Sequence, residues 1–389
     1  MTPFGVLLGV VLAIHAGVAA VLVANLWSFA RDRRRALPTA LPTVSVLVPA
    51  RNEEANLRAL LPTLLAQRGV EAEVVVVDDA SEDGTWAVLQ EHADDRLVAV
   101  RGDGPPAGWV GKPHALYQAA RRATGDVFVF LDADAQLRDD GALARLVGRW
   151  VANGGAGTAL TGLPRYLDRG PAALLTSLVP FAVLAALPVP LVPHVQAPSL
   201  SALNGQIWLL GAADYRRLAP HEAVKSDVLE DVMIGRYLKR SGVRLFFQDL
   251  GGEVAVRMYR TFSEAWRGFQ KNAALLAGGK PGRPVTTGFV SFLALYVVSW
   301  VVPSALWIGG AAGLWALASL VGIKLVIDRA GRFPLWVSAL APVTLALGAA
   351  LQLDSARAHA TGRVAWKGRA VGHAEPASTP AERTGRAGV

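Results

Sequence analysis

Two carboxylates, Asp132 and Asp134, directly follow the apolar run 127–131. An unbroken run with β-branched and aromatic residues is typical of a strand buried on both faces of a parallel sheet. Open α/β sheets place their ligands at the carboxyl ends of such strands. Two Asp side chains there could share Mg²⁺ or Mn²⁺, and the cation would in turn hold a diphosphate. Because Asp also favours turns, the spacing by itself leaves a solvated turn open.

Two earlier predicted strands end in the same way. The run 43–49 leads into Ala50 and Arg51, and the run 73–77 leads into Asp78 and Asp79. Helical patterns at 52–67, 85–92 and 112–124 separate the strands, which indicates βαβ units and a mostly parallel sheet with its polar strand ends on one edge. Neither a Gly-x-Gly-x-x-Gly turn nor a P-loop follows the first strand, so a dinucleotide cofactor and a Walker-type phosphate site are not expected.

Apolar stretches near both ends of the 389-residue chain indicate a membrane protein, and the mean hydropathy is +0.34. Residues 3–30 carry no charge, and the arginines of 31–35 follow them. That order predicts an uncleaved N-terminal anchor with a cytoplasmic domain behind it. The absence of cysteine excludes thiolate chemistry. The net charge of +8 gathers beside apolar spans and in the tail, which fits anionic lipids better than nucleic acid.

The apolar residues 171–193, which include Pro180, Pro188 and Pro190, interrupt the predicted catalytic domain, so we expect an interfacial or re-entrant helix pair there. Segments near 285–304, 305–327 and 334–352 could each cross a membrane. Three crossings would place the arginine-rich tail outside, against the positive-inside tendency. Either one segment is re-entrant or two of them form a single kinked span.

The motifs together resemble the inverting family 2 glycosyltransferases. The resemblance rests on VPARNEE at 48–54, VDDASEDGT at 77–85 and LDAD at 131–134, in that order and spacing. The segment GWVGKPHAL at 108–116 resembles a membrane-bound subset that glycosylates lipids such as carotenoids and hopanoids. VAWKGR at 364–369 is similar to the closing motif of that subset. The resemblance implies a Rossmann-like nucleotide-diphospho-sugar transferase (GT-A) domain over 43–275.

The resemblance also implies roles for the donor-side residues. The base and ribose pocket would be lined by Pro49, Ala50, Arg51 and Glu53. Asp79, or its neighbour Asp78, would accept hydrogen bonds from the base or ribose, although either could instead cap the next helix. Lys112 would reach the diphosphate or the acceptor, unless it is an ordinary exposed lysine. Asp132 and Asp134 would hold the metal and diphosphate.

On the acceptor side, VLEDV at 228–232 matches the Glu-Asp element of the family, so Asp231 is the expected general base with Glu230 beside it. Gln206 and Trp208 lie in a segment that resembles the acceptor strand, and Arg257 and Lys271 follow where diphosphate contacts are expected. Polysaccharide synthases carry Gln-x-x-Arg-Trp here, and this chain does not, which favours transfer of a single sugar.

The sequence therefore predicts an α/β enzyme between membrane helices, divided as 1–30 anchor, 31–42 basic linker, 43–275 catalytic domain, 285–352 membrane helices and 353–389 basic tail. The expected reaction moves one sugar from a nucleotide-diphosphate sugar such as a UDP-sugar to a lipid acceptor at the cell membrane. A polyprenyl-phosphate glycosyltransferase, a polysaccharide synthase and a non-catalytic nucleotide-sugar-binding protein remain alternatives. The motifs leave open the sugar, the acceptor, Mg²⁺ versus Mn²⁺ and the oligomeric state.

Overall fold

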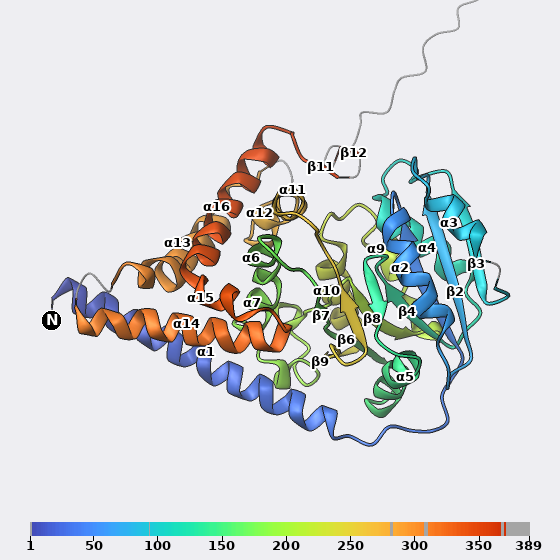
Figure 1. The fold of residues 1–389 in the computed structure, drawn as a ribbon, viewed down its shortest axis with the longest axis horizontal. Helices are drawn as coiled ribbons and strands as arrows, with labels where there is room; N and C mark the ends of the chain where they lie inside the picture. Colours follow the sequence, from blue (N-terminus) through green and yellow to red (C-terminus); the bar gives the residue numbers. More distant parts are fainter. Residues whose placement is uncertain (1, 93, 281–282, 307–309, 367–368, 371–389) are drawn as a thin grey trace, which may run out of the picture.

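The computed structural model describes residues 2–92, 94–280, 283–306, 310–366 and 369–370. An α/β part and a helical part lie side by side (Figure 1). Helix α1 (Pro3–Arg33) runs along the helical part and ends beside the α/β part. Its last turn includes arginines expected in the linker, and Arg33 pairs with Asp249 at 3.1 Å. Helix α1 is thus attached to the α/β part by an ion pair as well as by the chain.

A seven-stranded sheet with the order β3-β2-β1-β4-β8-β6-β9 forms the centre of the α/β part. Strand β8 runs antiparallel to both of its neighbours and the other pairs are parallel, so the expected mostly parallel sheet is confirmed. The bounds are β1 (Val44–Ala50), β2 (Ala72–Asp79), β3 (Leu97–Gly102), β4 (Val127–Leu131), β6 (Thr158–Leu163), β8 (Ile207–Gly211) and β9 (Arg244–Asp249).

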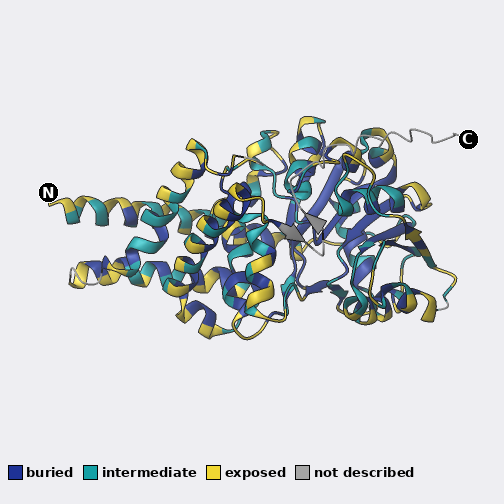
Figure 2. Cartoon of the chain, turned by 90° about the horizontal axis from the view of Figure 1, so that it is seen from above, coloured by how far each residue is buried: buried dark blue, intermediate teal, exposed yellow. Residues whose placement is uncertain are grey.

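The apolar runs arise because the sheet has a hydrophobic core on each face. Successive side chains of a strand point to opposite faces, and in β4 the residues Phe128 and Phe130 enter one core while Val127, Val129 and Leu131 enter the other. The strands are correspondingly among the most buried elements in Figure 2.

Helices cover both faces of the sheet. The leucines of α2 (Glu54–Leu65) recur at helical spacing and enter one core, whereas the apolar face of α4 (Gly111–Arg122) enters the other. The remaining helices of this part are α3 (Thr85–Glu91), α5 (Ala142–Ala152), α8 (Ala212–Leu218), α9 (Pro220–Ala223) and α10 (Glu230–Arg240).

A small second sheet extends the edge where β4 ends. In it β10 (Val254–Val256) lies between β5 (Ala135–Leu137) and β7 (Arg165–Tyr166). The pairing brings Arg257 beside Asp134, whose carbonyl oxygen accepts a 3.0 Å hydrogen bond from the Arg257 amide. Residues more than 100 positions apart in the chain thereby meet at one site.

The apolar segment 171–193 forms the short helices α6 (Ala172–Thr176) and α7 (Leu178–Leu184) and a 3-10 turn at Val189–Leu191, and a second 3-10 turn follows at Pro198–Leu200. The buried Asn25 of α1 holds its end: Asn25 Nδ2 donates to the carbonyls of Leu184 and Leu187, and Asn25 Oδ1 accepts from the Val189 amide. The expected helix pair is therefore present. Its position in a membrane interface stays a prediction.

The helical part continues with α11 (Phe262–Gln270), α12 (Ala273–Leu276), α13 (Thr287–Tyr296), α14 (Ala311–Gly331), α15 (Leu335–Ala339) and α16 (Ala341–Ala360). A π-helical turn at Val297–Val301 and a 3-10 turn at Val302–Ser304 extend α13. Within the described ranges, three helices are long and apolar enough to cross a membrane, namely Pro3–Arg33, Thr287–Ser304 and Ala311–Gly331. Several of their large apolar side chains are exposed, which suits contact with lipid.

The third expected C-terminal segment, 334–352, differs from the structure. It is divided between α15 and α16, α16 is not among those three helices, and it continues to Ala360 with the charged residues Asp354 and Arg357. The predicted tail thus begins as helix. Residues 367–368 of the closing motif, and 371–389, lie outside the described residues.

Candidate active site

The ends of β1 and β2 are joined by Arg51. Its guanidinium donates to the carbonyl oxygens of Asp79 at 2.9 Å and Ala80 at 2.7 Å and pairs with Glu82 at 3.2 Å. Asn52 and Ala80 both have positive φ, of 52° and 55°, a conformation that non-glycine residues seldom adopt. Arg51 therefore stabilises two tight bends that shape the predicted nucleotide pocket.

The other residues predicted for this pocket lie around the same bends. Pro49 is half-buried and Ala50 is buried at the end of β1, and the Glu53 carboxylate accepts a 2.7 Å hydrogen bond from the amide of Asn56. The structure thus brings all four residues predicted after the first strand to the edge where β1 ends.

Asp78 and Asp79 end strand β2 and are both buried. Asp78 Oδ1 accepts from the amide of Ser81 at 2.9 Å and so holds the turn. Neither residue caps α3, whose N-cap is Gly84, so the helix-cap alternative is wrong. Burial lowers the pKa of His114 and the Asp79 carboxylate opposes this shift, which indicates that Asp79 lies close to the α4 motif.

Lys112, in the first turn of α4, lies between two carboxylates. Its Nζ is 2.7 Å from Asp132 Oδ1 and 3.2 Å from Glu230 Oε1. The Asp231 carboxylate is oriented by the amides of Val232 at 2.8 Å and Gly205 at 3.3 Å. Side chains from β4, α4 and α10 thus meet in one cluster, and the alternative of an ordinary exposed Lys112 is excluded.

Gly205 packs tightly against this cluster, although no local sequence pattern singles it out. A Cβ at Gly205 would lie 3.1 Å from Lys112 Nζ and 3.2 Å from Asp231 Oδ2. Those distances are tighter than ordinary van der Waals contacts, so only glycine fits between the two side chains without displacing one of them.

Burial and neighbouring charges shift the pKa values of the side chains in this cluster. Burial and the neighbouring Glu230 carboxylate raise the pKa of Asp231 to about 6, and Lys112 and the two amides partly oppose the rise. Burial disfavours the charged form of Lys112, but the carboxylates of Asp132 and Glu230 outweigh it and raise the lysine pKa.

Lys271 faces the same cluster from the end of α11. Burial lowers its pKa, while Glu230, Asp231 and Asp132 raise it and Lys112 adds to the lowering. The structure thus places the predicted Lys271 beside the predicted base. Its backbone carbonyl accepts a 2.9 Å hydrogen bond from His359 Nε2 of α16.

Asp134 lines a polar cavity of about 440 Å³. Arg257, which the sequence predicted, shares this cavity with Arg169 and Arg260, which it did not. The buried Asp168 orders one wall, because its carboxylate accepts from the amides of Tyr259 at 2.8 Å and Met258 at 3.4 Å. Three arginines therefore share the cavity that Asp134 lines.

The two predicted metal ligands face a common neighbour. Burial raises the pKa of the Tyr259 phenol, and the carboxylates of Asp134, Asp168 and Asp132 add to this rise. Although no group of three or more metal-ligating side chains occurs among the described residues, Mg²⁺ characteristically takes one or two carboxylates and completes its shell with phosphate and water oxygens. The hard oxygen donors of Asp132 and Asp134 fit such a cation.

The two predicted acceptor residues differ. Gln206 is buried, its carbonyl accepts from the Asp132 amide at 3.2 Å, and its Nε2 has no hydrogen-bond partner in the part of the chain that the structure describes. A ligand would satisfy that donor. Trp208, however, is buried in the core and stacks on Phe130 with ring centroids 3.8 Å apart. The predicted acceptor contact of Trp208 is therefore wrong.

A family model and several known proteins are similar to this chain in sequence. Residues 45–183 match the model of glycosyl transferase family 2. The 4,4'-diaponeurosporenoate glycosyltransferase of Staphylococcus haemolyticus is 25% identical over 369 residues, covering 87% of this chain and 90% of that protein. The protein of the same name from Staphylococcus aureus (strain USA300) is 25% identical over 250 residues, covering 62% of this chain and 64% of that protein.

A solved structure shares the fold. The mannosyltransferase PcManGT from Pyrobaculum calidifontis, in complex with GDP-Man and Mn²⁺, superposes with a TM-score of 0.51 and 22% identity and covers 91% of this chain and 98% of its own. That likeness confirms the expected GT-A-like fold. The chain is therefore a glycosyltransferase in which residues 45–183 match the family 2 model, and it resembles the 4,4'-diaponeurosporenoate glycosyltransferases of staphylococci.

Proposed function

We propose that this glycosyltransferase transfers a single sugar, with inversion, from a UDP-sugar to a lipid acceptor such as a carotenoid or another isoprenoid. The observation that carries the proposal is the Asp231 carboxylate, whose pKa of about 6 suits a general base near neutral pH. The three candidate spans and the names of the staphylococcal relatives support a lipid acceptor.

In the proposed reaction Asp231 accepts the proton of the acceptor hydroxyl as the oxygen attacks the anomeric carbon. The bond from that carbon to the diphosphate oxygen breaks with its electron pair, and the nucleoside diphosphate leaves. An acceptor carboxylate would attack without this proton transfer. The ammonium groups of Lys112 and Lys271, which face the same carboxylate cluster, would stabilise charge on the leaving diphosphate.

A divalent cation, Mg²⁺ or Mn²⁺, would supply further charge neutralisation for the leaving group. Asp132 and Asp134 are the residues that would hold it. Since Asp132 is paired with Lys112, binding of the cation and the donor would require Lys112 to exchange this partner for the diphosphate.

The proposed location is a multi-pass position in the cell membrane with the catalytic part in the cytoplasm. With α1 and two C-terminal spans, Thr287–Ser304 and Ala311–Gly331, the end of α16 returns to the side of the catalytic part. The arginines at the end of α1 lie on that side as well, in agreement with the positive-inside tendency. Two C-terminal spans therefore place the arginine-rich tail on the cytoplasmic side, whereas three would place it outside.

Mass spectrometry of lipids from cells with and without the protein tests the proposal, with an Asp231→Asn strain as control. A lipid that gains one hexose only with the active protein is the expected result. A ladder of hexoses would instead identify a polysaccharide synthase. A labelled polyprenyl phosphate would identify the polyprenyl-phosphate alternative, and donor binding by the purified protein without transfer to any lipid would identify a non-catalytic binding protein.

A further inference from the structure

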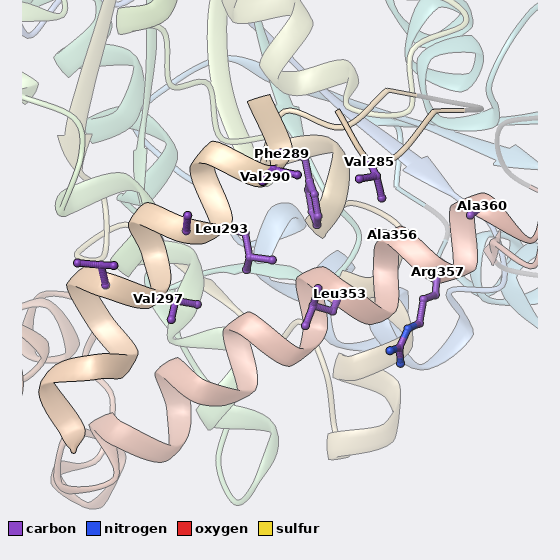
Figure 3. Close-up of a pocket in the computed structure, with 11 residues that line it drawn as sticks. Val285, Phe289, Val290, Leu293, Val297, Leu353, Ala356, Arg357 and Ala360 are labelled. Atoms are coloured by element: carbon purple, nitrogen blue, oxygen red, sulfur yellow. The ribbon is translucent and has the colours of Figure 1, made fainter. Parts of the chain in front are cut away.

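An apolar groove of about 720 Å³ lies between α13 and α16, away from the catalytic cluster. Figure 3 shows Phe289 and Leu293 on one wall and Leu353 and Ala356 on the other, with side chains directed into the space between the helices. Several lining residues are exposed to an extent unusual for apolar side chains: Val285 is 61% exposed and Val290 is 54% exposed. The groove thus lacks a covering partner within the described chain.

One end of the groove is cationic. Arg357 is the single charged residue that lines it, and it makes no ion pair with any residue that the structure describes. The nearby acid on α16, Asp354, is engaged elsewhere, because it accepts hydrogen bonds from Trp266 at 2.8 Å and Gln270 at 2.6 Å. Lys280 and Arg283 are exposed just before the groove residue Val285. Two further cationic side chains thus precede the groove in the chain, and Arg357 is the one that lines it.

The groove belongs to the part of the chain that meets the membrane. Its first wall, α13, is part of the candidate span Thr287–Ser304, so the apolar stretch of the groove would open to hydrocarbon and its cationic end would lie at the polar boundary. A chain of methylene groups matches the apolar walls, and an acidic head group matches Arg357.

We propose that the α13–α16 groove binds an anionic membrane phospholipid, with an acyl chain between the two helices and the acidic head group at Arg357. The proposal is independent of which sugar or acceptor the enzyme uses. Helix α16 also connects the groove to the active site, because its opposite face contacts α12 and the end of α11: Ser355 Oγ accepts from the Ala274 amide at 3.0 Å, and His359 donates to the carbonyl of Lys271.

The test uses the purified full-length chain in detergent, delipidated and then given equal amounts of phosphatidylglycerol and phosphatidylcholine with identical acyl chains. Native mass spectrometry counts the lipid that stays bound. We expect phosphatidylglycerol to be retained in clear preference, and Arg357→Gln to reduce this preference by about fivefold, the usual effect of one basic residue at an anionic surface. Val290→Trp fills the groove and should reduce retention of both lipids.

Matched controls lie on another candidate span. Arg329→Gln and Leu325→Trp remove an exposed charge and enlarge an exposed apolar residue on α14, and both should bind lipid as the wild type does. Equal retention of the two lipids by the wild type, or unchanged retention in both groove variants, would overturn the proposal. A bound isoprenoid that neither phospholipid displaces would assign the groove to the acceptor, and a lipid-free dimer would assign it to a second copy.

Discussion

The pH dependence of transfer gives the sharpest test of the catalytic cluster. With an Asp231 pKa of about 6, about one tenth of the enzyme carries the unprotonated base at pH 5 and about nine tenths at pH 7. The value of kcat/KM for a hydroxyl acceptor should therefore fall about tenfold between pH 7 and pH 5. In Asp231→Asn we expect a loss of about 10²–10⁴-fold at pH 7 and no remaining acid limb.

Two neighbours should move this limb in opposite directions. The Glu230 carboxylate disfavours a second negative charge and so raises the pKa of Asp231, whereas the Lys112 ammonium lowers it. Glu230→Gln should shift the midpoint of the limb downward by roughly one pH unit, and Lys112→Met should shift it upward. These shifts are separate from any change in the plateau rate, so general damage to the site would not reproduce them.

The assay is initial-rate transfer of labelled sugar from pH 5 to pH 8 at saturating metal, with extraction of the lipid product. Asp95→Asn, which removes an exposed carboxylate remote from the cluster, serves as control and should leave the profile unchanged. A wild-type midpoint near the ordinary aspartate value, or the same midpoint in both neighbour variants, would refute the assignment of Asp231 as a base tuned by Glu230 and Lys112.

Three further changes test the site and its support. Asp134→Ala should abolish the dependence of donor binding on Mg²⁺ or Mn²⁺, measured by calorimetry with and without the cation; preserved dependence would contradict its role as a ligand. Gly205→Ala should reduce the turnover rate about tenfold or more with little change in melting temperature, because the added methyl group displaces Lys112 or Asp231. Asp328→Leu should cost about 3–5 kcal/mol of stability by leaving buried Lys324 without its carboxylate, whereas the double variant with Lys324→Met should melt closer to the wild type.

Much of the catalytic edge could be predicted from local patterns. The apolar runs before Asp79 and Asp132 predict strands buried on both faces, and parallel strands bring their carboxyl ends together at one edge of the sheet. Lys112, Asp231 and Lys271 could be selected only through resemblance to a family, and the structure brings all three to the Asp132 end of β4.

Long-range pairing accounts for what the sequence did not reveal. Arg169 and Arg260 reach the cavity of Asp134 because β7 and β5 both pair with β10, and no local pattern encodes that contact. The predicted acceptor contact of Trp208 fails because every residue of β8 is buried. Apolar and polar residues do not alternate along this strand, so its sequence does not reveal which face of the sheet each side chain occupies. Helix α16 continues beyond residue 352, the end predicted from hydropathy. Asp354 and Ser355 accept hydrogen bonds from α11 and α12, and these bonds stabilise its last turns.

The hydrogen bond from His359 to the carbonyl of Lys271 bears on whether the catalytic domain can be separated from the C-terminal helices. The family match ends at residue 183, and even the wider segment 43–275 would include Lys271 without the helix that holds its backbone. An excised catalytic domain would thus keep the nucleotide edge but lose the support for one wall of its reaction centre. Helix α16 thus links the C-terminal helical part to the catalytic fold, so exchange of either part with a relative would require both faces of α16 to be transplanted together.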